Sequence, residues 1–373
     1  MVRKVIITLS LLILSLLPAG CNRQETVLPT VRIGHVPHDH HSALYIAASN
    51  PEFFRANGNL YLEEITPRKK YRLMAGNRPQ AMIILTPASD CRDLIKNLGE
   101  GRLDLAFGSI TTNLHFIDLG QPLKIAAPIM AEGASLVMSK NFPAGNWAEF
   151  VSYAKARQEP IRIGYKVNFS HNLILENALQ HSGLSFSKQI DQPGSEITLI
   201  NLHGARNLLP ALQRRLIDGF VVDQPYSSLA EFQNIGKTIV ELHELPPENY
   251  WQNHPCCVVS IHNNFYGQQP EVSQQLITLF LRANRYIQTN RDESILQVAK
   301  WLELPVEVEK KSIPTIMFKT GYDNDWKRGV DFLISSLING EKLNNLVKKA
   351  YEKNRADELI YQLDLFEQAS KEI

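Results

Sequence analysis

The sequence has few cysteines, almost no excess of charge of either sign and, after its first residues, no long apolar run. Four cysteines among 373 residues are too few for a disulfide scaffold. The 39 lysine and arginine residues nearly balance the 38 aspartate and glutamate residues, so no basic field is available to hold a nucleic acid. An apolar share of 44% and a charged share of 21% are typical of a globular chain with a sizeable core.

Several common enzyme motifs are missing as well. The sequence contains no G-x-S-x-G elbow, no Walker loop, no H-E-x-x-H pair and no G-x-G-x-x-G turn. These absences favour a protein that binds a molecule without transforming it. We therefore expect neither an enzyme nor a cofactor, with a metal ion as the one alternative discussed below.

The first twenty residues have the pattern of a secretory signal. A basic start is followed by a largely apolar run, Val5 to Leu17, too short to cross about 30 Å of hydrocarbon as a helix. Pro-Ala-Gly then precedes Cys21, an order that resembles a bacterial lipobox. The sequence predicts a signal peptide over residues 1–20, a lipid on Cys21 and a tether over residues 21–30. The body is thus expected in the cell envelope, anchored on the extracytoplasmic face; ordinary secretion is the alternative.

Strand and helix patterns alternate along the chain in two blocks. The predicted strands are 31–36, 60–65, 81–85, 103–107, 123–130, 161–165, 197–201, 220–222 and 256–261. The predicted helices are 43–55, 90–98, 113–119, 147–156, 170–180, 205–215, 271–289, 294–302, 326–337 and 341–363. This alternation predicts a two-lobed α/β protein with parallel strands and helices on both faces of each sheet. In such sheets ligands bind beyond the carboxyl ends of the strands, beside helix N-termini.

Four segments, in this order and spacing, resemble the periplasmic solute-binding proteins of ABC importers. They are Val31-Arg32-Ile33-Gly34-His35-Val36-Pro37, residues 94–108 (LIKNLGEGRLDLAFG), residues 218–225 (DGFVVDQP) and residues 254–259 (HPCCVV). The most similar branch is the nitrate, sulfonate and taurine group, which includes binding proteins for the pyrimidine precursor of thiamine. The resemblance runs from residue 31 to beyond residue 299.

This resemblance implies a two-lobed type II periplasmic-binding fold, in which each lobe is a mainly parallel sheet flanked by helices. Residues 31–130 and 246–373 would form lobe one, and residues 131–245 lobe two. A small anion or heterocycle would bind between the lobes of a monomer, and their hinged closure would present the bound form to a permease and its ATPase. The stretch 67–90 is longer than the family pattern and is interpreted as an added hairpin.

Polar residues at the ends of predicted strands are candidates for ligand contact, because a helix N-terminus offers free N–H groups and the positive end of the helix dipole. The candidates of this kind are Ser109, Thr111, Thr112, Ser170, His171, Asp223, Gln224 and Tyr226. The alternatives are plain helix caps and a hinge turn fixed by Pro225.

Two features bear on the kind of ligand. No arginine or lysine stands out at the predicted cleft, which suits an anion held by helix N-termini. Four aromatic residues near the cleft would equally suit a flat ring. They are Tyr45, Tyr165, Phe169 and Tyr226.

The loop after the first predicted strand is rich in histidine. Four imidazoles and one carboxylate lie within residues 35–41, the segment called the histidine loop below. Such ligands suit Zn²⁺ and similar cations, although ligands so close along one loop cannot all reach one ion. Contact with an anionic or heterocyclic ligand and a solvated loop are the alternatives. The ligand candidates are His35, His38, His40, His41 and Ser42, and the metal candidates are His38, His40 and Cys256.

Cys256 and Cys257 are neighbours on a predicted strand, so their side chains are expected to face opposite sides of the sheet. A bond between them would be strained, and Cys91 is an alternative partner for either. A soft metal site that joins these thiols to the histidine loop competes with a role as small buried residues. The alternative functions are therefore a metal-binding lipoprotein and a pyrimidine-synthase-like enzyme on the same fold.

Overall fold

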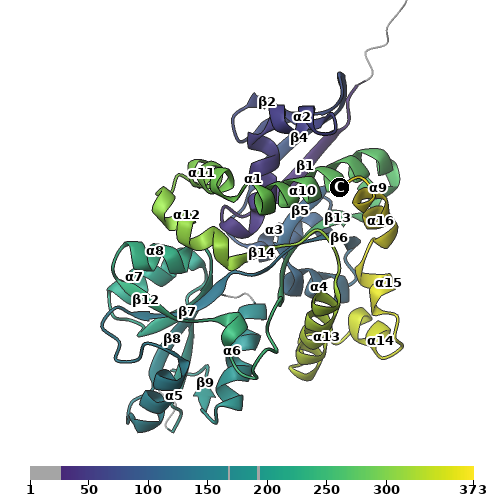
Figure 1. Cartoon of the computed structure of the whole chain (residues 1–373). Coiled ribbons are helices and arrows are strands. Elements are labelled where there is room, and N and C mark those ends of the chain that lie inside the picture. Colours follow the sequence, from purple (N-terminus) through teal and green to yellow (C-terminus); the bar gives the residue numbers. More distant parts are fainter. Residues whose placement is uncertain (1–26, 167–168, 191–193) are drawn as a thin grey trace, which may run out of the picture.

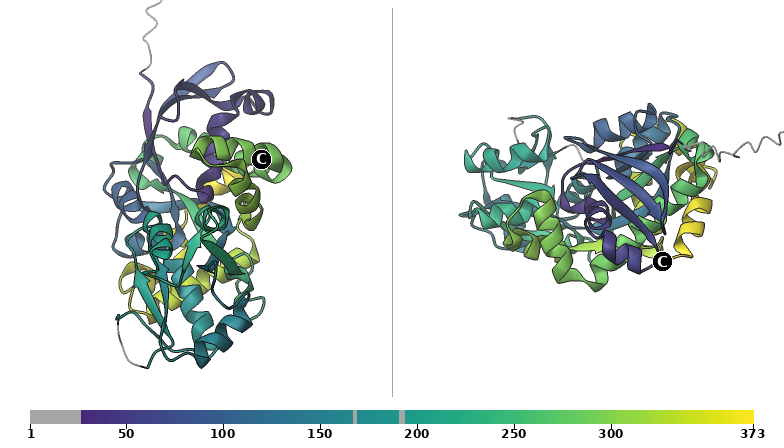
Figure 2. Two further views of the ribbon diagram at one scale, coloured as in Figure 1. Left: turned by 90° about the vertical axis from the view of Figure 1, so that its left-hand side faces the viewer. Right: turned by 90° about the horizontal axis from the view of Figure 1, so that it is seen from above.

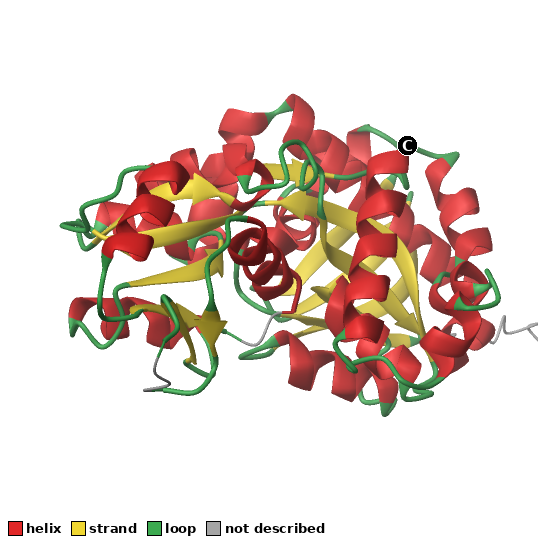
Figure 3. Ribbon diagram, turned by 90° about the horizontal axis from the view of Figure 1, so that it is seen from below, coloured by secondary structure: helices red, strands yellow, loops and turns green. Residues whose placement is uncertain are grey.

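The computed structural model describes residues 27–166, 169–190 and 194–373. Within these ranges the strands form two separate sheets, and helices cover both faces of each (Figures 1 and 3). The predicted two-lobed α/β class is confirmed. The predicted signal peptide and lipidated Cys21 lie outside the described residues, as does most of the predicted tether.

The larger lobe is built on an eight-stranded sheet in the order β14-β6-β13-β5-β1-β4-β3-β2. Its strands are β1 (Thr30–His35), β2 (Leu60–Thr66), β3 (Lys70–Ala75), β4 (Arg78–Pro87), β5 (Leu105–Ser109), β6 (Leu123–Glu132), β13 (Pro255–His262) and β14 (Ile316–Phe318). β1 pairs in parallel with β4 and β5, whereas the other described pairs are antiparallel.

This sheet is therefore mixed rather than mainly parallel, for two reasons. The strands β2, β3 and β4 form consecutive hairpins, which confirms the hairpin predicted within residues 67–90. In addition, β13 returns from the other lobe and enters between β5 and β6, where it is antiparallel to both neighbours.

The smaller lobe is built on a six-stranded sheet in the order β12-β7-β11-β8-β10-β9. Its strands are β7 (Ala134–Ser139), β8 (Ile161–Tyr165), β9 (Phe186–Ser187), β10 (Ile197–Asn201), β11 (Gly219–Asp223) and β12 (Gly236–Glu241). β10 pairs in parallel with β8 and β9, and β11 pairs in parallel with β8. β7 is antiparallel to β11 and β12. The carboxyl ends of β8, β10 and β11 thus meet at one edge.

Two segments carry the chain between the sheets (Figures 1 and 2). β6 ends at Glu132 and β7 begins at Ala134, so Gly133 alone separates strands of different sheets. The backbone turns there through positive φ angles of 63° at Glu132 and 68° at Gly133. The chain returns between β12 and β13, over residues 242–254.

The helices follow the strands in chain order. The larger lobe contains η1 (Asp39–His41), α1 (Ser42–Ser49), α2 (Pro51–Ala56), α3 (Cys91–Gly99), α4 (Ile110–Asp118), α9 (Asn263–Gln268), α10 (Pro270–Thr289), α11 (Arg291–Leu302), α12 (Val306–Ser312), α13 (Asn324–Asn339), α14 (Leu346–Tyr351), α15 (Ala356–Ile360) and α16 (Leu363–Ser370). The smaller lobe contains α5 (Trp147–Ala156), α6 (Phe169–His181), α7 (Leu208–Gln213) and α8 (Tyr226–Phe232). Among the described helices, none is at once long enough and apolar enough to span a bilayer.

Two predicted helices are wrong in extent. The helix predicted over residues 43–55 is broken between α1 and α2, because Pro51 lacks an N–H group and holds Asn50 out of the helical region. The helix predicted over residues 341–363 is divided between α14 and α15, and Asn354 takes a φ of 55° between them.

The core of the larger lobe lies on both faces of its sheet. Alternate residues of β5 face opposite sides: Leu105 and Phe107 belong to the cluster with α1 and α10, and Ala106 to the cluster with α3, α4 and α13. Helices on both faces hold the strand ends, and the loops that follow them, in fixed positions at the edge that faces the smaller lobe.

Candidate functional site

A cavity of about 530 Å³ lies between the two lobes. The larger lobe lines it with Val36, Pro37, His38, Ala88, Ser89, Asp90, Cys91, Arg92 and Asp93, and the smaller lobe with Lys166, His203, Gly204, Ala205, Arg206 and Tyr226. These residues follow the carboxyl ends of β1 and β4 on one side and of β8, β10 and β11 on the other. This is the edge at which ligands bind in open α/β sheets.

The cavity wall carries cationic groups, which corrects the expectation of a cleft without arginine or lysine. Lys166, Arg92 and Arg206 all line the cavity. Lys166, which is partly exposed, forms an ion pair with Oδ1 of the buried Asp223. Burial acts to lower the pKa of Lys166, but the carboxylate of Asp223 outweighs burial and raises it. The same pairing lowers the pKa of Asp223 against the effect of burial, so both groups are charged at neutral pH.

His38 of the larger lobe lies beside this ion pair. Its Nδ1 atom lies 3.4 Å from Asp223 Oδ2, and the ring is 2% exposed. Burial lowers the pKa of His38 to about 3, so the ring is neutral. Its Nε2 atom has no hydrogen-bond partner among the described residues. His38 therefore brings a spare polar atom to the cavity.

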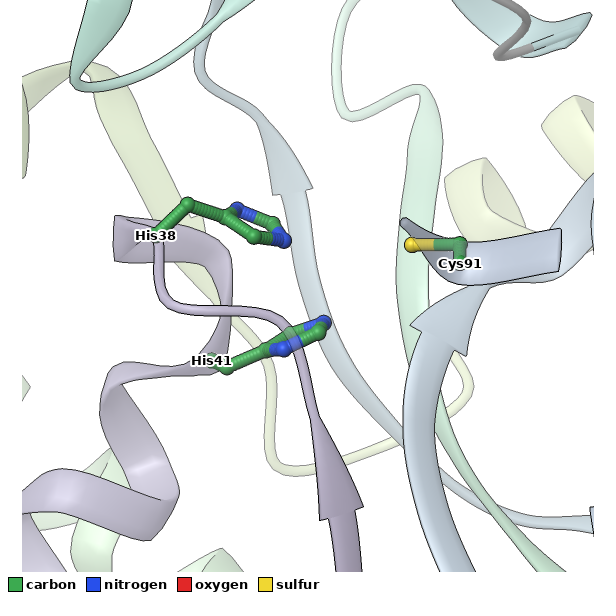
Figure 4. A group of neighbouring side chains, drawn as sticks. All are labelled: His38, His41 and Cys91. Carbon is green, nitrogen blue, oxygen red and sulfur yellow. The ribbon is translucent and has the colours of Figure 1, made fainter. Parts of the chain in front are cut away.

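His38, His41 and Cys91 face one another (Figure 4), with their ligand atoms within 4.8 Å of each other, and His38 and Cys91 line the cavity. The backbone N–H of Val36 donates to His41 Nδ1 at 3.0 Å, so the proton of the neutral ring is on Nε2. Burial holds the pKa of His41 well below its usual range and raises that of Cys91 to about 11. His41 and Cys91 thus offer an N–H and an S–H donor, which suit a ligand rich in acceptors.

A second cluster lies deeper and contains both neighbouring cysteines. Cys256 Sγ is 3.3 Å from His40 Nδ1, 3.5 Å from His171 Nε2 and 3.8 Å from Cys257 Sγ. Cys257 Sγ is 3.8 Å from His40 Nδ1. The hydrogen bond with Cys257 lowers the pKa of Cys256 well below its usual range, whereas burial raises that of Cys257. All four residues are buried.

The expectation that Cys256 and Cys257 face opposite sides is wrong. The pairing of β13 with β6 shifts register on both sides of Cys257. Such an irregularity bends the strand and re-aims side chains, so both thiols reach His40. A disulfide between Cys91 and either of them is absent from the described structure, where all three cysteines are free.

Other predicted ligand residues lie away from the cavity lining. Ser109 caps α4 and accepts from the N–H of Thr112, and its Oγ lies 2.7 Å from Thr112 Oγ1 and 3.5 Å from Thr111 Oγ1. Ser42 Oγ donates to the carbonyl of Asp39 at 2.6 Å. These contacts are those of buried caps, and a role of these residues in ligand contact stays a prediction.

The remaining candidates are divided between the two clusters and the core. Ser170 is the second residue of α6 rather than its cap, and His171 reaches the thiol cluster. Gln224 accepts from the N–H of Ser228, at the start of α8. His35 lies 3.5 Å from the buried hydroxyl of Tyr45.

Of the four predicted aromatic residues, Tyr226 lines the cavity. Tyr45 is fully buried and stacks on Trp301 with ring centroids 5.1 Å apart, and Tyr165 is absent from the cavity lining. The side chain of Phe169 lies outside the described residues.

Most of the polar residues that line the cavity are absent from the predicted ligand set, among them Lys166, Cys91, Arg92 and Arg206. Two of them had a usable signal. Lys166 directly follows the predicted strand 161–165, and Cys91 opens the helix that follows the predicted strand 81–85. The strand-end rule, applied to every strand, would have selected both.

Comparisons with known proteins show the family to which this sequence belongs. The sequence matches the NMT1-like family over residues 24–303. An uncharacterised protein of Methanocaldococcus jannaschii is 29% identical over 143 residues, which are 38% of this chain and 99% of that protein.

Solved structures are similar over most of the chain. A ligand-binding component of an ABC-type import system from Staphylococcus aureus, solved with zinc bound, has a TM-score of 0.68 at 17% identity and covers 91% of this chain and 99% of its own. The periplasmic nitrate-binding protein of Synechocystis PCC 6803 has a TM-score of 0.67 at 15% identity and covers 92% of this chain and 89% of its own. These likenesses confirm the type II periplasmic-binding fold and the resemblance seen in the sequence.

Proposed function

Because this chain belongs to the NMT1-like family and has the fold of periplasmic binding proteins, we propose that it is the solute-binding component of an ABC importer. It captures a small anion or heterocycle, of the nitrate, sulfonate, taurine or thiamine-precursor type, and hands it unchanged to a permease and its ATPase. It acts as a monomer on the extracytoplasmic face of a membrane, where a lipid on Cys21 anchors it.

One observation carries this proposal, the cavity of about 530 Å³ between the lobes. A volume of this size suits a small molecule. Both lobes contribute polar atoms to its wall, with His38 and Cys91 from one side and Lys166 and Arg206 from the other. A solute in this position contacts both lobes at once, so its binding favours the arrangement in which they are close together.

The donors around the cavity support an anionic or acceptor-rich solute. Lys166 and Arg206 are cations that line the cavity, as does the S–H group of Cys91. The ring of Tyr226 adds a flat surface, which suits a heterocycle or an alkyl chain. The carboxylate of Asp223 is already occupied by Lys166 and does not repel an anion strongly.

Closure requires a hinge, and the two crossings of the chain between the sheets support one. In the proposed motion residues 31–130 and 246–373 move as one lobe and residues 131–245 as the other. Gly133 and the 242–254 segment join them. In the right-hand view of Figure 2 the smaller, teal lobe stands beside the larger one.

The test is binding of a defined panel to the purified protein: nitrate, taurine, ethanesulfonate and an aminopyrimidine precursor of thiamine. We expect one of them to raise the melting temperature and to be recovered unchanged. Arg206→Gln, which removes an exposed cation from the cavity wall, should weaken that binding about tenfold, the loss of about one charged hydrogen bond. Lys140→Met, an exposed lysine of the smaller lobe, is the control.

Two results would contradict the proposal. One is that no member of the panel stabilises the protein and native mass spectrometry finds no co-purified small molecule. The other is that the recovered solute has been chemically altered, which would favour the enzyme alternative.

A further inference from the structure

We propose that His40, Cys256 and Cys257 form a binding site for a borderline or soft divalent cation such as Zn²⁺, separate from the solute cavity. The ligands are one imidazole nitrogen and two thiolates, the donor types that such cations prefer. The inference does not depend on which solute the cavity holds.

The spacing of the three ligand atoms matches one face of a tetrahedral site. The two sulfur atoms are 3.8 Å apart, and they lie 3.3 and 3.8 Å from His40 Nδ1. With Zn–S distances of about 2.3 Å and Zn–N distances of about 2.0–2.1 Å, tetrahedral geometry separates sulfur from sulfur by about 3.8 Å and sulfur from nitrogen by about 3.6 Å. Little movement is therefore needed to receive the ion.

The tautomer of His40 is suited to this role. Its Nε2 atom lies 2.9 Å from the carbonyl oxygen of Gly133, which can only accept a hydrogen bond. Nε2 therefore carries a proton, and Nδ1, which faces the two thiols, is the ring nitrogen that can bind an ion when it gives up its own proton. A carbonyl behind a ligating histidine is the usual outer-shell partner in metal sites, because it fixes both the tautomer and the ring orientation.

Among the described residues, the two other groups of candidate ligand atoms fit a cation less well. In the group of His38, His41 and Cys91, the hydrogen bond from Val36 leaves the proton of His41 on the atom that would have to bind. In the group of His38, His40 and Asp223, the carboxylate is already paired with the ammonium of Lys166. A second cation there would be repelled by Lys166.

The fourth position of the proposed site faces the smaller lobe. His171 on α6 lies with Nε2 3.5 Å from Cys256 Sγ, whereas His40 and both cysteines belong to the larger lobe. A cation that recruits His171 would join β13 to α6 across the cleft. Its binding therefore favours the arrangement in which the lobes are close together.

The experiment is a titration of the reduced, chelator-treated full chain with Co²⁺ alone, followed by Zn²⁺. We expect one equivalent of Co²⁺ to bind with a thiolate-to-cobalt charge-transfer band and tetrahedral d–d bands, both abolished when Zn²⁺ displaces it. Cys256→Ser and Cys257→Ser should each remove the charge transfer of one thiolate. Each should also weaken Co²⁺ binding by a larger factor than the loss of an outer-shell partner, which costs about 10–100-fold. Cys91→Ser is the matched control and should bind as the wild type does.

A second measurement on the wild type covers the case in which a serine variant fails to fold. Zn²⁺ should slow maleimide labelling of Cys256 and Cys257, mapped by peptide mass, without slowing that of Cys91. The inference is overturned if Co²⁺ binds without a thiolate band, if only Cys91→Ser abolishes binding, or if the folded, reduced protein binds no Co²⁺. Solute binding is read out separately, so either proposal can fail alone.

Discussion

Asp39 and Glu309 form a buried pair of carboxyl groups between the histidine loop and α12. Ser312 donates a hydrogen bond to Asp39 Oδ2. Burial, with the nearby carboxylate of Asp39 adding to it, raises the pKa of Glu309 to about 10. Burial also raises the pKa of Asp39, but only to about 6, because Ser312 stabilises its charged form. Glu309 therefore keeps its proton at neutral pH.

This pair makes stability depend on pH. The pKa of Glu309 in the folded state lies above its ordinary value of 4.5, so the folded protein holds this proton more tightly than the unfolded chain does. The resulting contribution to the free energy of unfolding is complete below about pH 4.5 and is lost progressively as the pH rises toward about 10. The amide of Glu309→Gln cannot ionise. This variant should therefore have a free energy of unfolding about 1–3 kcal/mol above that of the wild type at about pH 8.5.

Urea unfolding of the wild type and of Glu309→Gln at about pH 5.5 and about pH 8.5 checks this prediction. The variant should show the smaller change between the two pH values. Glu307→Gln, at an exposed position of the same helix, is the control. Equal pH dependence in the wild type and Glu309→Gln would show that Glu309 is ionised in the folded protein.

The ion pair of Lys166 and Asp223 gives a second prediction at the scale of residues. Asp223 is 1% exposed, so Lys166→Met leaves a buried carboxylate without its cation. Such a change should lower the free energy of unfolding by about 3–5 kcal/mol. The double variant Lys166→Met, Asp223→Asn removes both charges and should recover most of this loss in chemical unfolding. A double variant no more stable than the single one would show that the charge of Asp223 is not the cause.

At the scale of elements, the crossing from β6 to β7 is tightly constrained. Gly133 has a φ of 68°, and a Cβ atom added there would lie 2.7 Å from Ile316 Cγ1 and 2.9 Å from His40 Nε2. Both the backbone conformation and the close approach require glycine. The same residue accepts the hydrogen bond of His40, so the hinge and the histidine loop are in direct contact.

Gly133→Ala should therefore lower the free energy of unfolding by about 1–3 kcal/mol, because the added methyl group is strained and displaces His40. Gly321→Ala is the matched control, since nothing lies within 4 Å of its Cβ position and its φ is not positive. Thermal and urea unfolding of both variants measure the difference. Equal stability of the two would show that the crossing tolerates a side chain.

The sequence predicted elements well where the periodic pattern was strong and was separated from neighbouring patterns. The helix at 147–156 and the strand at 161–165 have the same bounds in the structure as in the prediction. The strand β7 was missed because it follows β6 after one residue, so no turn marks the change of sheet. Pro51, which causes the break between α1 and α2, is visible in the sequence. The prediction of one continuous helix gave more weight to the apolar spacing.

The candidate site was predictable in its place but less so in its composition. The histidine loop and the strand ends correctly located the edge where the cavity lies. Arg206 joins that wall only because the two lobes face each other there, a contact between segments far apart in sequence. The convergence of Cys256 and Cys257 depends on a register shift that no residue pattern announces.

At the scale of the whole molecule, the two lobes touch outside the crossing segments as well. Lys311 on α12 forms an ion pair with Glu231 on α8 at 2.9 Å. The ion pair is partly exposed and contributes at most about 1 kcal/mol. A contact of this strength is compatible with the proposed closure of the lobes.

The proposed anchor also belongs to this scale. Cys21→Ser removes the thiol to which a lipid would be attached, so the protein should move from the membrane fraction to the soluble extracytoplasmic fraction. Cell fractionation with mass measurement of the N-terminal peptide tests this, and Cys91→Ser serves as the control. If Cys21→Ser remains with the membranes, the anchor is not a lipid on Cys21.

Small-angle X-ray scattering of the purified protein, with and without the solute identified in the binding panel, tests the central claim most directly. Closure of the two lobes around a solute predicts a smaller radius of gyration at saturation, and Arg206→Gln should require more solute to reach it. An unchanged scattering curve at a solute concentration that saturates binding would contradict the account.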